Sequence, residues 1–115
     1  MHLTRAQDAP AYQAAGHHHM TMHRLQGLEA SPLNGVWAAR LTLAPGGRVD
    51  PKGSPAAKLY LVTEGSVRFR GGETTVLLGP GDSVFVLPGE EREFSEAAGA
   101  RAVMYLTMLE NYPSA

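Results

Sequence analysis

Four of the five histidines in this chain lie between residues 17 and 23, in the run HHHMTMH. If this segment forms a β-strand, alternation places His17, His19 and His23 on one face. Imidazole binds zinc, nickel, copper and iron, and a His-x-His pair can reach a single ion. The spacing therefore predicts a site for a divalent transition metal, with Zn, Ni, Fe or Mn as candidates. The alternative is a solvated polar arm that holds no cofactor or binds metal only adventitiously.

The composition indicates one globular domain. A chain of 115 residues fits a single core, and 43% hydrophobic against 18% charged residues is typical of a folded protein. A net charge of -1 provides no basic field for nucleic acid, and no apolar stretch is long enough to span a membrane. We therefore expect a soluble, cytoplasmic protein without nucleic-acid or membrane partners. The absence of cysteine excludes disulfides and thiolate chemistry.

Short apolar runs separated by glycine and proline extend from Val36 to Leu109, which predicts an all-β sandwich or barrel. Turns are expected at residues 45–47 and at Gly71-Gly72. In the first run, alternation places four residues on the face expected to point inward: Trp37, Ala39, Leu41 and Leu43. The expected strands cover residues 36–43, 59–62, 67–69, 76–78, 83–87 and 102–109.

The first 35 residues differ from the rest, because they carry the histidine run between a segment containing alanine and proline and a link broken by glycine and proline. We expect residues 1–35 to form an N-terminal arm with one strand near residues 18–25. Residues 36–115 would then form the β-barrel domain.

Two segments resemble the two motifs of the cupin family, and together they cover most of the expected barrel. In PGGRVDPKGSPAAKLYLVTEG, Gly46 and Gly65 stand at the two ends of the first motif with matching spacing. In GDSVFVLPGEEREF, Gly81 and Gly89 match the second motif, and its proline is displaced by one position. The resemblance implies a double-stranded β-helix, or jelly-roll, barrel. It also implies a homodimer, in which the N-terminal strand can join the neighbouring sheet.

The positions that hold the metal in metal-dependent cupins carry different residues here. The resemblance assigns two histidines, a glutamate and a third histidine to the positions of Lys52, Ser54, Lys58 and Arg92. Lysine binds a metal only after losing its proton, and arginine effectively never loses it. The resemblance thus predicts a barrel without the family's usual metal site, in which the arm histidines could supply ligands instead.

Two interpretations of these cations remain open. Alternation places Lys58 on one face with Tyr60, so cations inside a partly desolvated barrel could bind an anion, with Arg92 offering a planar fork to a carboxylate or phosphate. Alternatively, Lys52 is solvated in a loop and Arg92 pairs with glutamates of the GEERE run. A lysine held inside needs a counter-charge, either Asp50, a glutamate or a ligand.

We expect a small organic ligand, favoured to carry a carboxylate, in the mouth of the barrel. An enzyme could be a metal-assisted oxygenase, isomerase or lyase that uses the arm histidines, or a metal-free catalyst with an arm histidine as base and Arg92 or Lys58 stabilising charge. The alternative is a non-catalytic binding or sensing module. The expected lining residues are Arg40, Lys52, Lys58, Tyr60, Phe85, Arg92 and Tyr105.

Overall fold

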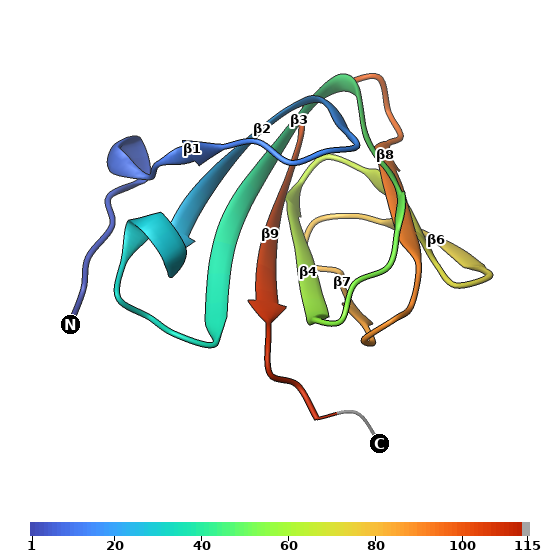
Figure 1. Cartoon of the computed structure of the whole chain (residues 1–115). Helices are drawn as coiled ribbons and strands as arrows, with labels where there is room; N and C mark the ends of the chain where they lie inside the picture. Colours follow the sequence, from blue (N-terminus) through green and yellow to red (C-terminus); the bar gives the residue numbers. More distant parts are fainter. Residues whose placement is uncertain (114–115) are drawn as a thin grey trace.

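One antiparallel sheet of nine strands curls into a nearly closed barrel in the computed structural model, which describes residues 1–113 (Figure 1). This confirms the expected all-β, cupin-type jelly roll, although the last two residues of the predicted 36–115 segment lie outside the described part. Two single-turn 3-10 segments, η1 (Ala6–Asp8) and η2 (Leu28–Ala30), flank the N-terminal strands. The strands are β1 (Ala11–Tyr12), β2 (His17–Gln26), β3 (Val36–Lys52), β4 (Ala57–Glu64), β5 (Val67–Gly71), β6 (Thr74–Leu78), β7 (Ser83–Val86), β8 (Arg92–Glu96) and β9 (Ala102–Leu109).

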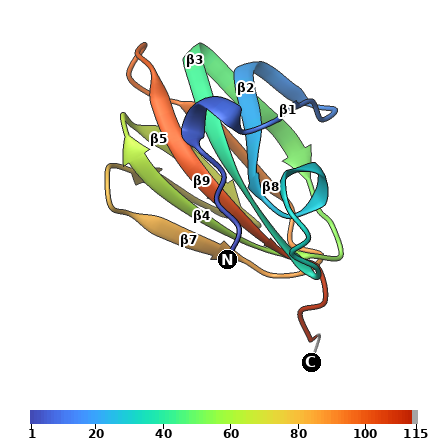
Figure 2. The same cartoon turned by 90° about the vertical axis from the view of Figure 1, so that its left-hand side faces the viewer.

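The long strand β3 organises the sheet, whose order is β6-β5-β8-β3-β9-β4-β7. Along one edge β3 pairs with β2, from His17 opposite Val49 to Gln26 opposite Ala38. Along the other edge it pairs first with β9 and then with β8. Figure 2 shows β2, β3, β9, β4 and β7 following one another across the near side of the barrel. The N-terminal segment is therefore paired into the same sheet as the barrel strands.

The core lies inside the barrel and is built from alternate residues of each strand. On β3, Ala39, Leu41 and Leu43 are all buried, as their alternation predicts. Aromatic rings extend this core, because Phe69 stacks on Phe94 with centroids 5.4 Å apart. Burying each large apolar side chain contributes roughly 1.5–3 kcal/mol. The inward faces of the strands thus provide most of the driving force for closing the sheet.

Two turns differ from the sequence-based expectation. Residues 45–47 do not end a strand, because β3 continues to Lys52 and changes its partner there from β9 to β8. The hairpin between β5 and β6 turns at Gly72-Glu73 rather than at Gly71-Gly72, since Gly71 is still paired with Thr74. Glycine at position 72 suits this turn because its φ is 57°. Within residues 1–113, no helix has the length and apolar character needed to cross a membrane.

Candidate functional site

A cavity of about 170 Å³ lies between the N-terminal segment and the inner side of the barrel. Strands from both parts of the chain contribute to its wall, including β1, β2, β3, β4, β8 and β9. Its lining residues are Tyr12, Gln13, Ala14, Ala15, His17, Arg24, Trp37, Leu41, Lys52, Ser54, Lys58, Tyr60, Arg92, Leu106 and Met108. No aspartate or glutamate of the described residues is among them.

The four positions at which the motif resemblance places metal ligands converge on this cavity, since Lys52, Ser54, Lys58 and Arg92 all line it. The chain contains two lysines, and both are in this group. Lys52 is exposed at the end of β3, whereas Lys58 and Arg92 are buried. The cavity therefore concentrates positive charge at its inner wall.

Arg92 is fixed at the start of β8 by two hydrogen bonds. Its Nε donates to the Tyr60 hydroxyl at 2.9 Å, and its Nη1 donates to the backbone carbonyl of Asp50 at 3.1 Å. Burial raises the pKa of Tyr60, although the nearby Arg92 opposes this effect, so the hydroxyl stays protonated at neutral pH. Tyr60 itself packs against Phe69 and Phe94, with centroids 5.1 and 5.4 Å away. An aromatic cluster thus holds the guanidinium in place.

Lys58 is buried on β4, a strand paired on both sides. Its side chain is 2% exposed, and its Nζ has no hydrogen-bond partner among residues 1–113. Burial lowers the pKa of Lys58, and the positive charges of Arg92 and Lys52 lower it further, while Glu90 acts weakly in the opposite direction. A buried ammonium without a partner is costly, so this position favours either a neutral amine or a bound anion.

The acidic side chains that could have neutralised these cations are engaged elsewhere. Asp50 accepts a hydrogen bond from His18 Nε2 at 2.8 Å, and this bond holds the pKa of the carboxyl below its usual range. Glu91 and Glu93 accept hydrogen bonds from Arg70 at 3.0 and 2.7 Å. Glu91 and Glu93 thus pair with an arginine on β5, and Glu90 accepts from the Leu87 backbone amide at 3.2 Å, which leaves Arg92 directed to its contacts inside the barrel.

The histidine run does not form one cluster. His17 lines the cavity, whereas His18 turns to Asp50 and His19 is exposed with a φ of 52°. The pairing of β2 with β3 shifts register at this point, so the regular alternation assumed for His17, His19 and His23 is interrupted. Within residues 1–113, no three histidine, aspartate or glutamate side chains come together as a metal site would require.

His17 is the histidine that could act on a molecule in the cavity. Its Nδ1 donates to the Ala15 carbonyl at 2.9 Å, which leaves Nε2 as the unprotonated nitrogen of the neutral ring. Burial lowers the pKa of His17, and the charges of Arg92 and Lys52 add to this effect. The ring is therefore neutral at physiological pH and available as a base.

A second part of the cavity wall was missed by the sequence reasoning. Arg24 of β2 lies over the rings of Tyr12 and Trp37, with its Cζ 3.5 and 4.1 Å from their centroids. Its Nε donates to Glu29 at 3.0 Å, while its Nη1 is buried without a partner among residues 1–113. Alternation along β3 already placed Trp37 on the inward face and could have identified it. Tyr12 and Arg24 depend on how the N-terminal segment crosses the barrel.

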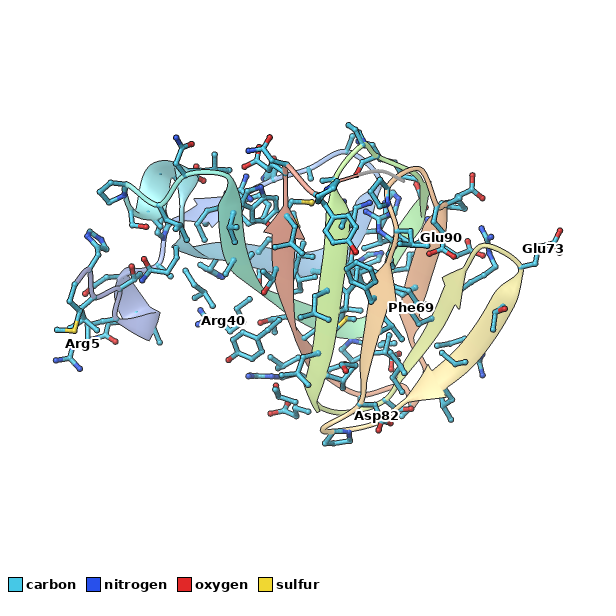
Figure 3. All side chains as sticks on the ribbon, turned by 90° about the horizontal axis from the view of Figure 1, so that it is seen from below. Arg5, Arg40, Phe69, Glu73, Asp82 and Glu90 are labelled. Carbon is cyan, nitrogen blue, oxygen red and sulfur yellow. The ribbon has the colours of Figure 1, made fainter. Side chains whose placement is uncertain are left out.

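Three of the expected lining residues lie outside the cavity. Arg40 pairs with Tyr105 across β3 and β9, on the face of the sheet opposite to the buried Ala39 and Leu41. Figure 3 shows Arg40 well apart from Phe69, which lies among the barrel strands. Phe85 is 44% exposed on β7. The period of two that turns Leu41 inward turns these residues outward.

The residues at the family's ligand positions do not fit a divalent metal. An ion there would meet the guanidinium of Arg92 and the amine of Lys58, with Lys52 nearby. Arginine does not coordinate, and each lysine would first have to lose a proton in a site already rich in positive charge. Of the histidines, His17 alone is among the lining residues. A single imidazole beside Ser54 is a poor donor set for such an ion.

Comparison with known proteins agrees with this architecture. Residues 39–109 match the sequence model of a protein family whose description is "Cupin domain". The protein named beta-D-galactosidase Rv1717, from Mycobacterium tuberculosis, is 36% identical over 110 residues, which cover 94% of this chain and 93% of that protein.

Two solved structures show the same fold at low sequence identity. An RmlC-like cupin from Shewanella frigidimarina superposes with a TM-score of 0.81 at 14% identity, covering 96% of this chain and 91% of that one. A predicted oxalate decarboxylase from Thermotoga maritima gives a TM-score of 0.80 at 20% identity, covering 96% of this chain and 99% of the other. Because the family model spans β3 to β9 and a relative is similar along nearly its whole length, this chain belongs to the cupin family.

Proposed function

We propose that the cavity binds a small organic anion and that a carboxylate is the group recognised. The observation that carries this proposal is that Lys58, which lines the cavity together with Arg92, has a buried Nζ with no partner among residues 1–113. A carboxylate would supply the missing acceptor and offset the repulsion among the cations. The remaining wall suits the organic part of such a ligand, because Leu41, Leu106 and Met108 are apolar.

A pair of sugars that differ in one group tests this proposal. D-galacturonate carries a carboxylate where D-galactose carries a hydroxymethyl group. We expect titration calorimetry at neutral pH to show D-galacturonate binding at least roughly tenfold more tightly, because a charge-assisted hydrogen bond contributes about 1.5–3 kcal/mol. Equal affinity for the two sugars would contradict recognition through the carboxylate.

Variants then locate the anion within the cavity. Lys58→Met and Arg92→Ala should each weaken D-galacturonate binding by roughly tenfold or more. Arg40→Met is the matched control, because Arg40 lies on the outer face of the sheet and should leave the affinity unchanged. Circular dichroism of each variant shows whether the fold is retained, which matters most for Arg92 because it holds Tyr60.

A second candidate function is hydrolysis of a β-galactoside. Two observations favour it: the name of the relative that is 36% identical over 94% of this chain, and the rings of Tyr12 and Trp37 in the cavity wall, a type of surface on which sugars stack. Most glycosidases use two carboxylates, however, and no described lining residue supplies one. Hydrolysis here would have to rely on His17 as the base.

Release of nitrophenol from 4-nitrophenyl β-D-galactopyranoside tests the second candidate directly. Turnover by the native protein that disappears in His17→Ala would support hydrolysis in this cavity. No turnover above that of a heat-denatured control would remove this candidate. Either result leaves the comparison of D-galacturonate with D-galactose as an independent test of anion binding.

A further inference from the structure

Lys58 has a combination of features that anion binding alone does not require. It is 2% exposed and its Nζ has no partner in the described chain, yet the residue lines a cavity wide enough for a small molecule. Its backbone is held on β4 between β9 and β7, with Met108 and Val86 as its cross-strand neighbours. Arg92 and Lys52 already provide two cations to the same cavity. A third cation strengthens the binding of an anion, but that role does not require its amine to be withdrawn from water.

We infer that Lys58 Nζ is a nucleophile that forms an imine with the carbonyl carbon of a 2-oxo acid whose carboxylate is held by Arg92 and Lys52. This inference rests on the proposed anion binding and names its ligand class. A 2-oxo acid places a carbonyl carbon directly beside its carboxylate. An anchored carboxylate would therefore present that carbon to the neighbouring amine. The other lysine, Lys52, is exposed and serves as a point charge.

The charges around Lys58 favour the neutral amine that this reaction needs. Burial lowers its pKa first, followed by Arg92 on β8 and Lys52 on β3, while Glu90 before β8 raises it. Desolvation beside another cation is a recognised way to activate a lysine for imine formation. The guanidinium of Arg92 supplies the positive charge that holds the carboxylate, and the lowered pKa of Lys58 favours the neutral amine that attacks. Arg92 can thus hold the carboxylate while Lys58 attacks the carbonyl carbon.

The step is balanced without an oxidant or reductant. The neutral amine adds to the carbonyl carbon, a carbon–nitrogen bond forms, and the carbonyl electron pair moves to oxygen. One proton passes from nitrogen to that oxygen, and a second, the one that the ammonium lost to become the neutral amine, protonates the resulting hydroxyl. The carbon–oxygen bond then breaks and water leaves, so that ammonium and carbonyl give a protonated imine and one water. His17 lines the same cavity with Nε2 unprotonated and can carry this proton.

Reductive trapping tests the inference. The full chain is incubated with pyruvate and sodium cyanoborohydride, and the product is examined by intact mass and peptide mapping. We expect one adduct per chain, located on Lys58. The map is easily interpreted, because the only amines are Lys52, Lys58 and the N-terminus. An adduct spread evenly over these amines, or absent from Lys58, would overturn the inference.

Two variants and a second ligand separate this inference from the proposed function. Lys58→Arg keeps a cation but removes the nucleophile, so it should bind pyruvate yet give no adduct, whereas Lys52→Arg should keep the adduct on Lys58. L-lactate has the carboxylate of pyruvate without its carbonyl. If L-lactate binds and pyruvate gives no adduct on Lys58, imine formation is refuted and anion binding stands. If neither acid binds while D-galacturonate does, the inference fails and anion binding stands. If none of the three carboxylates binds to the native protein, both proposals fail.

Discussion

The side chain of Lys58 is a local source of instability. Lys58 is 2% exposed, so its buried ammonium has lost most of its hydration, and it gains no hydrogen bond from residues 1–113 in return. Replacing it with methionine keeps a long, unbranched side chain and removes the charge. We expect Lys58→Met to raise the free energy of unfolding by about 1–3 kcal/mol, as measured by urea denaturation at pH 7. A less stable variant would show that the amine has a partner in solution.

The lowered pKa of Lys58 also predicts that the stability of the fold depends on pH. Because the folded-state pKa of Lys58 is lowered from its ordinary value of 10.5, the unfolded chain binds more protons between the two values, and stability rises with pH across that window. The advantage of Lys58→Met over the native chain should therefore shrink as pH increases toward 10. Measurements should stop there, because burial raises the pKa of Tyr12 to about 12 and tyrosine ionisation then favours unfolding. A constant difference would refute the lowered pKa.

At this scale, sequence reasoning could predict which way a side chain points but not what it meets. Strand alternation places Lys58 on the same face as Tyr60 and predicts that it points inward. In the structure both residues are buried. Whether Asp50 or a glutamate would neutralise it could not be predicted. That outcome depends on His18 reaching Asp50 from β2, and on Arg70 reaching the glutamates from β5. Such pairings are set by tertiary contacts between segments that lie far apart along the chain.

Two glycines of the first motif differ in the space that an added Cβ would find around them. Gly65 has a φ of 79°, and a Cβ there would lie 2.5 Å from the Arg101 carbonyl oxygen and 2.9 Å from Ala102 Cα. Gly46 has a φ of 81° but nothing within 4 Å of such an atom. Both Gly→Ala changes should lower stability by about 1–2 kcal/mol through the left-handed backbone, and Gly65→Ala should cost more because it also collides with backbone. Thermal unfolding of the two variants makes the comparison, and equal losses would contradict it.

The register shift between β2 and β3 explains why the arrangement of the histidines could not be predicted from their spacing. Gly47 approaches this strand so closely that a Cβ on it would lie 2.8 Å from the His19 carbonyl oxygen. The register shifts there, between His18 and Met20. A period of two holds only while a strand stays regular, and here residue 19 of β2 lies opposite residues 44–47 of β3, so the faces before and after this point do not follow one alternation. The glycine is visible in the sequence, but the strand that it approaches is known only from the fold.

For the whole molecule, the barrel was predictable and the completed cavity was not. Glycine and proline spacing from Val36 onward predicts the strands, because turns must recur at regular intervals in an all-β chain. The remaining wall comes from the first 35 residues, where Tyr12, His17 and Arg24 reach the barrel through β2. That contribution follows from the pairing of β2 with β3. The N-terminal segment is therefore as much a part of the candidate site as the two motifs.

The outer face of the sheet leads to a prediction about assembly. Leu59, Leu61 and Phe85 are 41%, 39% and 44% exposed on the adjacent strands β4 and β7. Apolar side chains gathered on one face commonly mark a contact surface, and a nearly neutral chain offers little charge repulsion between two copies. We propose that this face forms the homodimer, so light scattering after size exclusion should give twice the chain mass.

Leu61→Glu should lower the measured mass to that of a single chain, because two buried carboxylates would face each other across a two-fold contact. Leu28→Glu is the control, since Leu28 is 51% exposed on η2, which packs against β2 and is separated from β4 by β3 and β9, and it should leave the dimer intact. A native protein that is monomeric at every concentration tested would refute the proposal. Alternation also turns Leu61 away from the cavity that Tyr60 lines, so the monomeric variant should still bind D-galacturonate. Loss of binding together with the dimer would instead mean that the partner copy helps to shape the cavity.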